Sequence, residues 1–307
     1  MKVSVIIPTY NGAHKLPGIF KALKAQSFKG FELVVVVDGS TDNTKEVLAQ
    51  YQKEFQNVKV VYQENGGRAK VRNTGAKETS GDLLIFFDDD MMPKTDCLSE
   101  HIKHHQAFPY TILTGASIDR VENSTDFQKY KSYLTQKWSK GLIAIGNKPL
   151  HKKSLFITAA NFSIAKNLFF QLQGFDEQLT DAEDFDLAVR ANQQGINLFY
   201  DHSAFAWHAD PITGKSYIKR LRQYRKSQER LRELKPAVYS TIQLHHPVMP
   251  TGLKQMVYLF FARNYWVVWL DSKSFFKKLL PRFIRYKVYD LITTANGVYF
   301  PEQVKTD

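Results

Sequence analysis

Short apolar runs alternate with helical patterns over residues 1–90, and this alternation limits the possible folds more than any other feature of the chain. The apolar runs, rich in β-branched residues, are Val3–Ile7, Phe31–Val37, Val58–Tyr62 and Leu83–Phe87. Helical patterns lie between them at about 13–26, after Asp42 and at about 68–78. The alternation predicts an α/β fold, in which a doubly wound, mostly parallel, Rossmann-like sheet is covered by helices on both faces.

Each predicted strand is followed directly by a loop of polar residues or glycines. In open α/β sheets ligands bind in the crevice beyond the strand C-termini, so these loops are expected to line one site. The loops are Pro8–Asn11, Asp38–Asp42, Glu64–Arg68 and Asp88–Asp90. No Gly-x-Gly-x-x-Gly motif follows the first strand and no Gly-x-x-x-x-Gly-Lys-Ser/Thr motif occurs, which removes support for a dinucleotide oxidoreductase and for a P-loop NTPase.

Several side chains in these loops suit a nucleotide. Asp38 ends a long apolar run, where its carboxylate can accept hydrogen bonds from a base or a ribose. Asp42 is better explained as a helix cap, and Ser40 allows the same explanation. Arg68 and Arg72 begin a helix beside a Gly-Gly pair, where guanidinium groups and free N–H donors suit a diphosphate. An exposed helix surface is the alternative explanation for both arginines.

Three consecutive carboxylates, Asp88, Asp89 and Asp90, end the fourth predicted strand. Like charges this close resist joint ionisation, and burial beside a strand adds a desolvation cost, so a divalent cation with oxygen ligands is the natural compensation. A solvated acidic turn is the alternative if these residues are taken alone. Beyond a later strand-like run at 196–200, His208 is either a metal ligand or a histidine bonded within its own loop.

A second acidic cluster lies at the start of a predicted helix that ends near Gln194. The helix dipole favours acidic residues in a first turn, so part of this cluster needs no catalytic role. Glu183 and Asp184 nevertheless lie at the helix N-terminus, where a substrate can reach them. A carboxylate in that place can act as a general base toward a hydroxyl group.

The formal charge of +12 belongs entirely to the last third of the chain. Residues 1–214 hold 24 Lys and Arg against 24 Asp and Glu, whereas residues 215–307 hold 18 against 6, a difference of 12. A neutral body with a basic extension predicts an anionic partner, either lipid head groups or nucleic acid. The lone cysteine, Cys97, excludes an internal disulfide, and the first apolar run is too short for a signal peptide, so we expect a cytoplasmic protein.

The C-terminal third has the pattern of a membrane-interface segment. Residues 215–235 hold nine Lys or Arg and two Glu, with apolar residues on one helical face, which predicts a basic amphipathic helix. The apolar segments that follow are interrupted by Arg263 and contain Trp266 and Trp269, so segments lying in the interface are favoured over a spanning helix. We expect attachment to the anionic inner face of the plasma membrane through residues 215–290. The alternative is packing within a helical subdomain or a homodimer.

The stretch from Asp119 to Lys153 looks less regular, with aromatic residues such as Trp138 among many lysines. It predicts either an insert that shapes a specificity pocket or plain scaffold. No recognisable nucleic-acid motif accompanies the basic residues of the chain, so no specific nucleic-acid partner is expected.

A set of motifs in a fixed order covers about residues 1–210. They are Val5–Asn11, Val37–Asp42, Arg72–Gly75 before Gly81-Asp82, the Asp-x-Asp motif at Asp88 and Asp90, Gly174–Glu177, and Glu183-Asp184-x-Asp186-Leu187. Together they resemble the inverting glycosyltransferases of family 2, which have the GT-A fold. The chain departs from that pattern in the middle carboxylate, Asp89, and in Gly66-Gly67-Arg68.

The resemblance implies roles for particular residues. The base and ribose of a nucleotide would lie among Thr9, Tyr10, Asp38 and Asn65, with Ser40 nearby and Asp88 near the ribose. Asp90 would hold Mg²⁺ or Mn²⁺ on the diphosphate, and Asp184 would be the base with Glu183 beside it. With the residues argued above, the predicted donor-binding set is Pro8, Thr9, Tyr10, Asp38, Ser40, Asn65, Arg68, Arg72, Asp88 and Asp89. The predicted metal set is Asp90, Asp88 and His208.

The implied activity is a metal-dependent, inverting transfer of a sugar from a nucleotide diphosphate to a hydroxyl of a glycan or lipid-linked acceptor. UDP is the expected carrier, with GDP or dTDP as alternatives, and the expected pathway is cell-surface polysaccharide or glycolipid synthesis. The expected domains are a GT-A catalytic domain at 1–212, with donor binding at about 1–95 and acceptor binding and the base at about 96–212, and a helical, basic, aromatic-rich extension at 213–307. The alternatives are a sugar-1-phosphate nucleotidyltransferase, which would need a Gly-rich loop after the first strand, and a non-catalytic binding module on a decayed enzyme.

Overall fold

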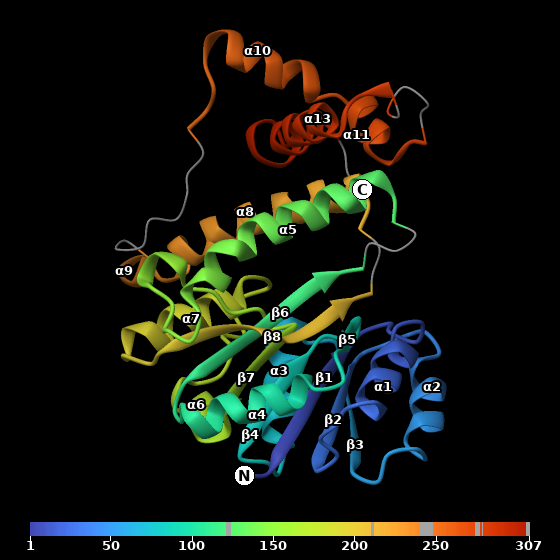
Figure 1. Cartoon of the computed structure of the whole chain (residues 1–307), viewed down its shortest axis with the longest axis vertical. Coiled ribbons are helices and arrows are strands. Elements are labelled where there is room, and N and C mark those ends of the chain that lie inside the picture. Colours follow the sequence, from blue (N-terminus) through green and yellow to red (C-terminus); the bar gives the residue numbers. More distant parts are fainter. Residues whose placement is uncertain (121–123, 210–211, 240–247, 274–276, 278, 305–307) are drawn as a thin grey trace. The chain divides into compact units, whose positions relative to one another are not determined.

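The chain forms two compact units, each with its own core. The computed structural model describes residues 1–120, 124–209, 212–239, 248–273, 277 and 279–304. The first unit comprises Met1–Arg120 and Gln136–Asp210, and the second comprises Val121–Thr135 and Pro211–Asp307. The long helix α5 (Asp126–Ile145) begins in the second unit and ends in the first (Figure 1).

The first unit is built on one eight-stranded sheet with the order β3-β2-β1-β4-β7-β6-β8-β5. Its strands are β1 (Val3–Thr9), β2 (Phe31–Asp38), β3 (Val58–Gln63), β4 (Leu83–Phe87), β5 (Met91–Pro93), β6 (Ile112–Asp119), β7 (Asn161–Ala165) and β8 (Leu198–His208). Strands β1 to β4 are mutually parallel, and β6 is parallel to β8, whereas β7 and β5 pair with antiparallel neighbours. The predicted α/β, mostly parallel sheet is therefore confirmed.

Helices cover both faces of this sheet, which explains why its central strands are apolar without alternation. Successive side chains of a strand point to opposite faces. In β1, Val5 and Ile7 belong to one buried cluster and Ile6 to another, so each face has its own core. The covering elements are α1 (Leu16–Lys24), α2 (Thr44–Tyr51), α3 (Gly67–Lys77), α4 (Cys97–Ala107), α6 (Lys166–Gln171), α7 (Glu183–Gln193) and the 3₁₀ turn η1 (Lys152–Ser154).

Most of the stretch from Asp119 to Lys153, which looks less regular in sequence, is the 20-residue helix α5. Phe127 and Tyr130 are fully buried and Leu134 packs beside them, a spacing of three and four residues that places them on one helical face. Lysines on the remaining faces obscured this stripe in the sequence. The later strand also differs from its prediction at 196–200, since β8 extends to His208.

The second unit is helical and rich in aromatic residues, as expected for the C-terminal extension. Its elements beyond the start of α5 are α8 (Gly214–Leu234), α9 (Pro236–Tyr239), α10 (Gly252–Phe261), α11 (Asn264–Asp271), α13 (Arg282–Thr294) and the π-helical turn η2 (Ala295–Tyr299). Tyr130, Tyr286 and Tyr289 meet in its core with edge-on ring contacts of 5.3 Å. Among the described residues, no helix combines the length and the apolar character that crossing a bilayer requires.

Candidate active site

Hydrogen bonds tie together the loops that follow the parallel strands, as the sequence predicted. The loop after β1 reaches the loop after β2, because the backbone N–H of Asn11 donates to Ser40 Oγ at 2.9 Å. Asn11 itself has a φ of +49°, and its side-chain oxygen accepts from the N–H of Thr41 at 2.7 Å. The loop after β1 also reaches the acidic cluster, since Thr9 Oγ1 donates to Asp89 Oδ2 at 2.7 Å. One crevice edge therefore collects residues far apart in sequence.

Asp38 holds the loop after β3. Its buried carboxylate accepts from Gln63 Nε2 at 2.6 Å, from the N–H of Gly66 at 2.8 Å and from that of Gly67 at 3.0 Å. The next residue, Gly39, has a φ of +71°, and a Cβ there would lie 2.7 Å from the backbone nitrogen of Asn65. Only glycine fits this turn. Asp38 thus fixes the loop that carries Asn65, and these contacts occupy part of its capacity to bind a base.

The remaining predicted nucleotide contacts differ in exposure. Pro8 lies within β1, paired with Val36, and Thr9 is committed to Asp89. Tyr10 is 52% exposed at the end of β1, so its ring is open to stacking by a planar ligand. Asp42 accepts from both the N–H and the hydroxyl of Thr44 at the start of α2, and also from the N–H of Ala13 at 3.2 Å, so it joins the loops after β1 and β2.

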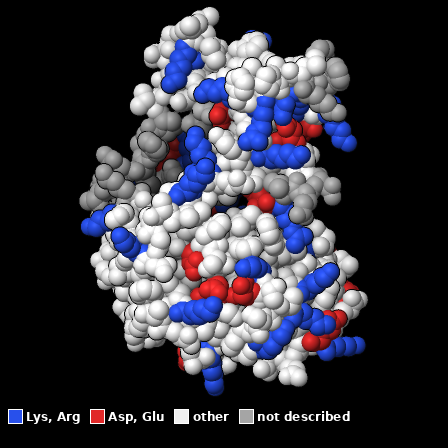
Figure 2. All heavy atoms as spheres, viewed as in Figure 1, with Lys and Arg blue, Asp and Glu red and all other residues white. Residues whose placement is uncertain are grey.

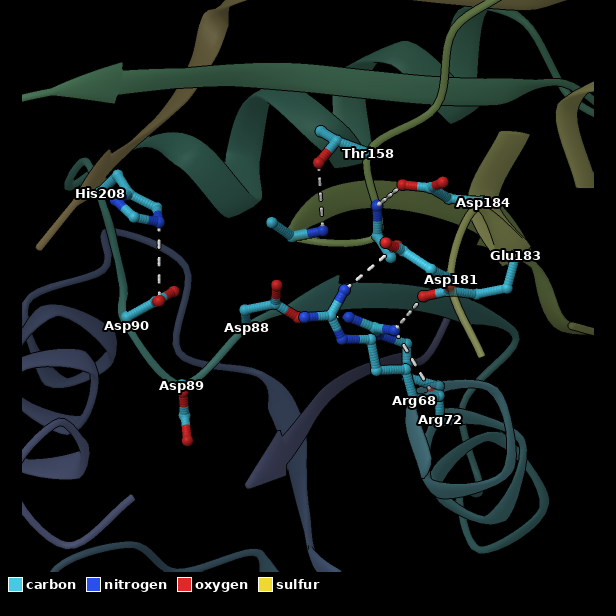
Figure 3. A network of polar contacts seen from close by, with 12 residues as sticks. Arg68, Arg72, Asp88, Asp89, Asp90, Thr158, Asp181, Glu183, Asp184 and His208 are labelled. Atoms are coloured by element: carbon cyan, nitrogen blue, oxygen red, sulfur yellow. Dashed lines mark hydrogen bonds and ion pairs between the residues drawn. The ribbon is translucent and has the colours of Figure 1, made fainter. Parts of the chain in front are cut away.

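Arg72 connects the two acidic clusters. Its guanidinium is 4% exposed and donates to Asp88 Oδ1 at 2.6 Å and to Glu183 Oε1 at 2.7 Å (Figure 3). Burial alone would raise the pKa of Asp88, but the adjacent Arg72 charge and its hydrogen bond lower that pKa below its usual range. Arg68, one helical turn earlier on α3, reaches Asp181 at 3.2 Å from an exposed position. Helix α3 therefore presents both arginines to the segment that begins α7.

The first turn of α7 carries three acidic residues with different partners. The helix starts after Ala182, whose φ of +61° is in the left-handed region. Glu183 accepts from Arg72, and Asp186 accepts from Arg190 Nε at 2.7 Å. Asp184 instead accepts from backbone groups, the N–H of Ala159 at 3.3 Å and its neighbour's N–H at 2.7 Å. It is the acid in this turn that accepts from backbone N–H groups rather than from an arginine.

The environment of Asp184 suits a general base. Burial first, and then the negative charge of Glu183, raise the pKa of Asp184 to about 6, while the Ala159 N–H and Arg72 oppose the shift. A carboxylate with a pKa near neutrality is a stronger proton acceptor than an ordinary one and is still ionised at pH 7.

The Asn73 side chain supports the neighbouring loop, because it both donates to and accepts from the backbone of Phe175 at 2.8 and 2.9 Å.

Asp89 and Asp90 lie on a different side of the cluster from Asp88. His208 Nε2 is 3.5 Å from Asp90 Oδ2, because β5 pairs with the end of β8 and sets Met91 beside His208. Lys15 Nζ lies 3.5 Å from Asp89 and 3.8 Å from Asp90. Burial raises the pKa of Asp89 to about 6 despite Lys15 and Thr9. Lys15 was missed in the sequence, where a lysine just before a helix carries no signal of its own.

A divalent cation fits this arrangement only if the protein and a bound diphosphate both coordinate it. Within the described part of the chain, no three His, Cys, Asp or Glu side chains converge on one metal position. Asp90 and His208 offer one oxygen and one nitrogen that face each other, whereas Asp88 is turned to Arg72 (Figure 3). Protein-bound Mg²⁺ commonly takes one or two protein ligands and completes its shell with substrate phosphates and water. The donor set therefore fits an ion held jointly with a diphosphate.

The sequence and the fold of this chain are similar to those of known proteins. The profile described as Glycosyl transferase family 2 matches residues 4–171. Glycosyltransferase AglE of Haloferax volcanii is 24% identical over 232 residues, which cover 72% of this chain and 71% of that protein. An uncharacterised glycosyltransferase of Bacillus subtilis, YfnE, is 29% identical over 222 residues, or 72% of this chain and 53% of YfnE.

Two solved structures share the fold over nearly the whole chain. Mannosyltransferase PcManGT from Pyrobaculum calidifontis, in complex with GDP-Man and Mn²⁺, superposes with a TM-score of 0.65 at 18% identity, covering 96% of this chain and 86% of the other. TarS residues 1–349 from S. aureus, in complex with UDP, gives a TM-score of 0.55 at 20% identity, covering 96% and 90%. At these identities the likeness concerns the fold alone.

Proposed function

Because this chain belongs to glycosyl transferase family 2 and is a nucleotide-sugar glycosyltransferase with a GT-A fold, we propose that it is a metal-dependent, inverting enzyme. The proposed reaction moves a sugar from a UDP donor to a hydroxyl group of a glycan or a lipid-linked acceptor. One observation carries the proposal: Arg72 joins Asp88, at the donor end of the crevice, to Glu183, the neighbour of Asp184. The donor site and the candidate base thus belong to one bonded assembly.

Asp184 is the proposed general base. The acceptor hydroxyl loses its proton to the Asp184 carboxylate while its oxygen forms a bond to the anomeric carbon. The bond from that carbon to the diphosphate breaks on the opposite face, and its electron pair leaves with the phosphate oxygen. Because there is a single displacement, the anomeric configuration inverts, and an α-linked donor yields a β-linked product. The raised pKa of Asp184 favours the proton transfer.

Negative charge grows on the diphosphate as it leaves, and this chain offers cations close to that position. A divalent ion bound by Asp90, His208 and the diphosphate would supply Lewis-acid stabilisation. Arg68 lies in the first turn of α3, where its guanidinium and the positive end of the helix dipole favour phosphate oxygens. Arg72 lowers the pKa of Asp88 and holds its carboxylate through a hydrogen bond of 2.6 Å.

The carrier and the pathway are also part of the proposal. PcManGT was solved with GDP-Man and Mn²⁺ and TarS with UDP, so both nucleotides occur in proteins of this fold. We favour UDP, and we propose a role in cell-surface polysaccharide or glycolipid synthesis at the inner face of the plasma membrane. The proposed acceptor is therefore either a glycan or a sugar carried on a lipid.

Two carboxylate substitutions separate binding from chemistry. Asp184→Asn should abolish sugar transfer and leave Mn²⁺-dependent binding of a UDP-sugar unchanged, because the proton acceptor is lost and the donor site is not. Asp90→Ala should abolish transfer and also strongly weaken that binding. Donor binding is measured by thermal shift with a panel of UDP- and GDP-sugars, and the product anomer by NMR.

An exposed acidic residue on α2 provides the matched control. Glu46→Gln should behave as the native protein in both assays, since Glu46 lies outside the crevice loops. Near-normal turnover by Asp184→Asn would remove that residue from the mechanism. Donor binding that is equally strong with and without Mn²⁺ would remove the metal from it.

A further inference from the structure

Helix α10 presents an apolar stripe to solvent. None of its ten residues, all of which the structure describes, is buried. Leu253, Met256, Val257 and Phe260 are 77, 67, 37 and 49% exposed. Their spacing of three, four and seven residues puts them on one face of the helix. Soluble proteins bury such a stripe against a core, so an exposed one indicates a partner outside the chain.

The next helix continues the same apolar surface. Tyr265 and Val268 of α11 are 68 and 63% exposed and are three residues apart. Trp266 joins the two helices, because its ring lies 5.3 Å from that of Phe260 and 5.2 Å from that of Tyr265. We call the exposed side chains Leu253, Met256, Val257, Phe260, Tyr265 and Val268 the α10–α11 surface.

The α10–α11 surface is held in place from behind. The ring of Tyr258 packs against that of Tyr299 at 4.7 Å, and Asn296 Nδ2 donates to the carbonyl of Phe261 at 2.9 Å. Leu270 and Val267 anchor α11 in the core of the second unit. The apolar face is therefore a preformed feature of a folded unit.

The segment that forms this surface is basic up to Asp271, which ends α11 and accepts from the backbone N–H of Gly214 at 2.7 Å. Residues 248–270 include Lys254 and Arg263 and no acidic residue. Arg263 lies between the two helices, with its guanidinium 5.7 Å from the ring centre of Phe260. In Figure 2 the surface over α10, at the top of the view, is mostly uncharged with a few basic side chains. Long basic side chains at the edge of an apolar face can extend their charges toward phosphate groups.

We propose that the α10–α11 surface binds an anionic lipid bilayer, with its apolar side chains in the interface and Lys254 and Arg263 at the level of the head groups. A ten-residue helix is too short to cross a bilayer but suits a position parallel to it. A second copy of the chain fits less well. In a symmetric dimer the same surface would face itself, which would bring Lys254 and Arg263 of the two copies toward one another.

This surface differs from the basic helix that the sequence singled out. In α8, Ile218 and Leu231 are buried in the second unit, and Arg225 donates to the carbonyl of Val298 at 2.7 Å. Arg222 donates to the carbonyls of Asn296 and Val304, both at 2.8 Å. The apolar face and two of the cations of α8 are therefore used inside the unit. We therefore assign the contact with lipid to α10 and α11 rather than to α8. This inference rests on the proposed function only in that the acceptor is expected at the membrane.

Flotation of the full chain with vesicles tests the proposal. Phosphatidylcholine vesicles that contain phosphatidylglycerol should carry the protein, and vesicles of phosphatidylcholine alone should carry less. Leu253→Gln combined with Phe260→Gln should lower partitioning by about tenfold or more, since each side chain would otherwise leave water for the interface. Lys254→Gln combined with Arg263→Gln should reduce the salt dependence of binding.

Tyr224→Gln on α8, another exposed aromatic position at 45% exposure, is the matched control and should bind vesicles normally. Circular dichroism and donor thermal shift establish that each variant is folded. Equal partitioning of the native protein and the Leu253→Gln/Phe260→Gln variant would overturn the proposal. A native protein that sediments as a dimer, and a variant that sediments as a monomer but still binds vesicles equally well, would also overturn it. Vesicle binding without donor binding would instead count against the proposed enzymatic function alone.

Discussion

At the scale of single residues, Arg72 decides how the acidic groups of the crevice behave. Its buried guanidinium lies between two carboxylates and lowers the pKa of Asp88, and removing it would leave buried acidic groups without a partner. Asp184 lies just beyond this pair and keeps a raised pKa of about 6. Of the two neighbouring acids, Glu183 is therefore paired with Arg72, and Asp184 is the one that can accept a proton.

Transfer activity should therefore fall as the pH drops below about 6. Asp184 accepts protons only when ionised, so kcat/KM should rise through the pKa of Asp184 and level off above it. Glu183→Gln removes the second-largest cause of the raised pKa and should move this acidic limb to lower pH. Steady-state pH profiles of both proteins check the shift.

Asp181→Asn is the control for this experiment, because it removes a nearby acidic charge that forms an ion pair with Arg68. Its acidic limb should coincide with that of the native protein. If Glu183→Gln left the limb where it was, the charge of Glu183 would have no part in tuning the base.

At the scale of elements, α4 is joined to the sheet by a buried polar chain. The Asn161 amide nitrogen on β7 donates to two backbone carbonyls, which turns its oxygen toward His101 Nε2 at 3.0 Å. His101 Nε2 must then carry the hydrogen, so its Nδ1 accepts from Ser163 Oγ at 2.8 Å. Ser163 in turn accepts from His105 Nε2 at 2.8 Å. A second proton on His101 would direct an N–H at Ser163 Oγ, and the Ser163 hydroxyl would then lose the acceptor that it has on neutral His101.

Acid should consequently destabilise the first unit before carboxylates titrate. Burial lowers the pKa of His101 to about 4 and that of His105 to about 3, from a usual value of 6.5. Because the histidine pKa is lower in the folded state, the unfolded chain binds more protons than the folded chain between about pH 6.5 and 4. The contribution of these histidines to the free energy of unfolding is therefore largest above about pH 6.5 and falls as the pH drops toward 4. Urea unfolding at stepped pH measures this loss.

Removing one member of the chain should flatten that pH dependence. His105→Gln loses a titrating group and should show a smaller decline in the free energy of unfolding between pH 6.5 and 4. His14→Gln, at an exposed position, should decline as the native protein does. Parallel curves for all three proteins would show that the buried histidines do not control acid stability.

At the scale of the whole molecule, the second unit is assembled from segments about 160 residues apart. Asp126, at the start of α5, accepts from Arg285 Nε at 2.9 Å and from Tyr289 OH at 2.7 Å, both on α13. Four residues further along α5, Tyr130 OH donates to Asp290 at 2.5 Å. The start of α5 is therefore part of the framework that carries α10 and α11.

Asp126→Ala should loosen the second unit and spare the first. The loss of a bidentate arginine pair and a tyrosine bond should cost roughly 1–3 kcal/mol in a partly exposed site. Hydrogen exchange of α13 should accelerate, while that of β1 and β4 stays unchanged. Glu229→Ala, which removes an exposed pair with Arg225, is the control and should cost less than about 1 kcal/mol. Faster exchange throughout the chain would contradict a local role.

Local patterns were sufficient for much of the fold and for part of the site. The four parallel strands and their loops followed from apolar runs ended by polar residues, and β4 has the predicted bounds. The association of Arg72 with both acidic clusters did not follow, because its partners lie 16 and 111 residues away. Lys15 was missed for a similar reason, because its acidic partners Asp89 and Asp90 are remote in sequence, whereas the apolar stripe of α5 was obscured by the lysines on its other faces.

The sequence by itself determined the alternation of strands and helices, the gathering of polar loops at one sheet edge and the confinement of excess positive charge to the last third. These are properties of neighbouring residues, which a linear pattern records. Only the tertiary structure decided which carboxylates are neutralised and which keeps a proton-accepting pKa, and which apolar helix faces are buried and which are exposed. Charge pairing and burial depend on distances in space between residues remote in the chain, and no local pattern contains those distances.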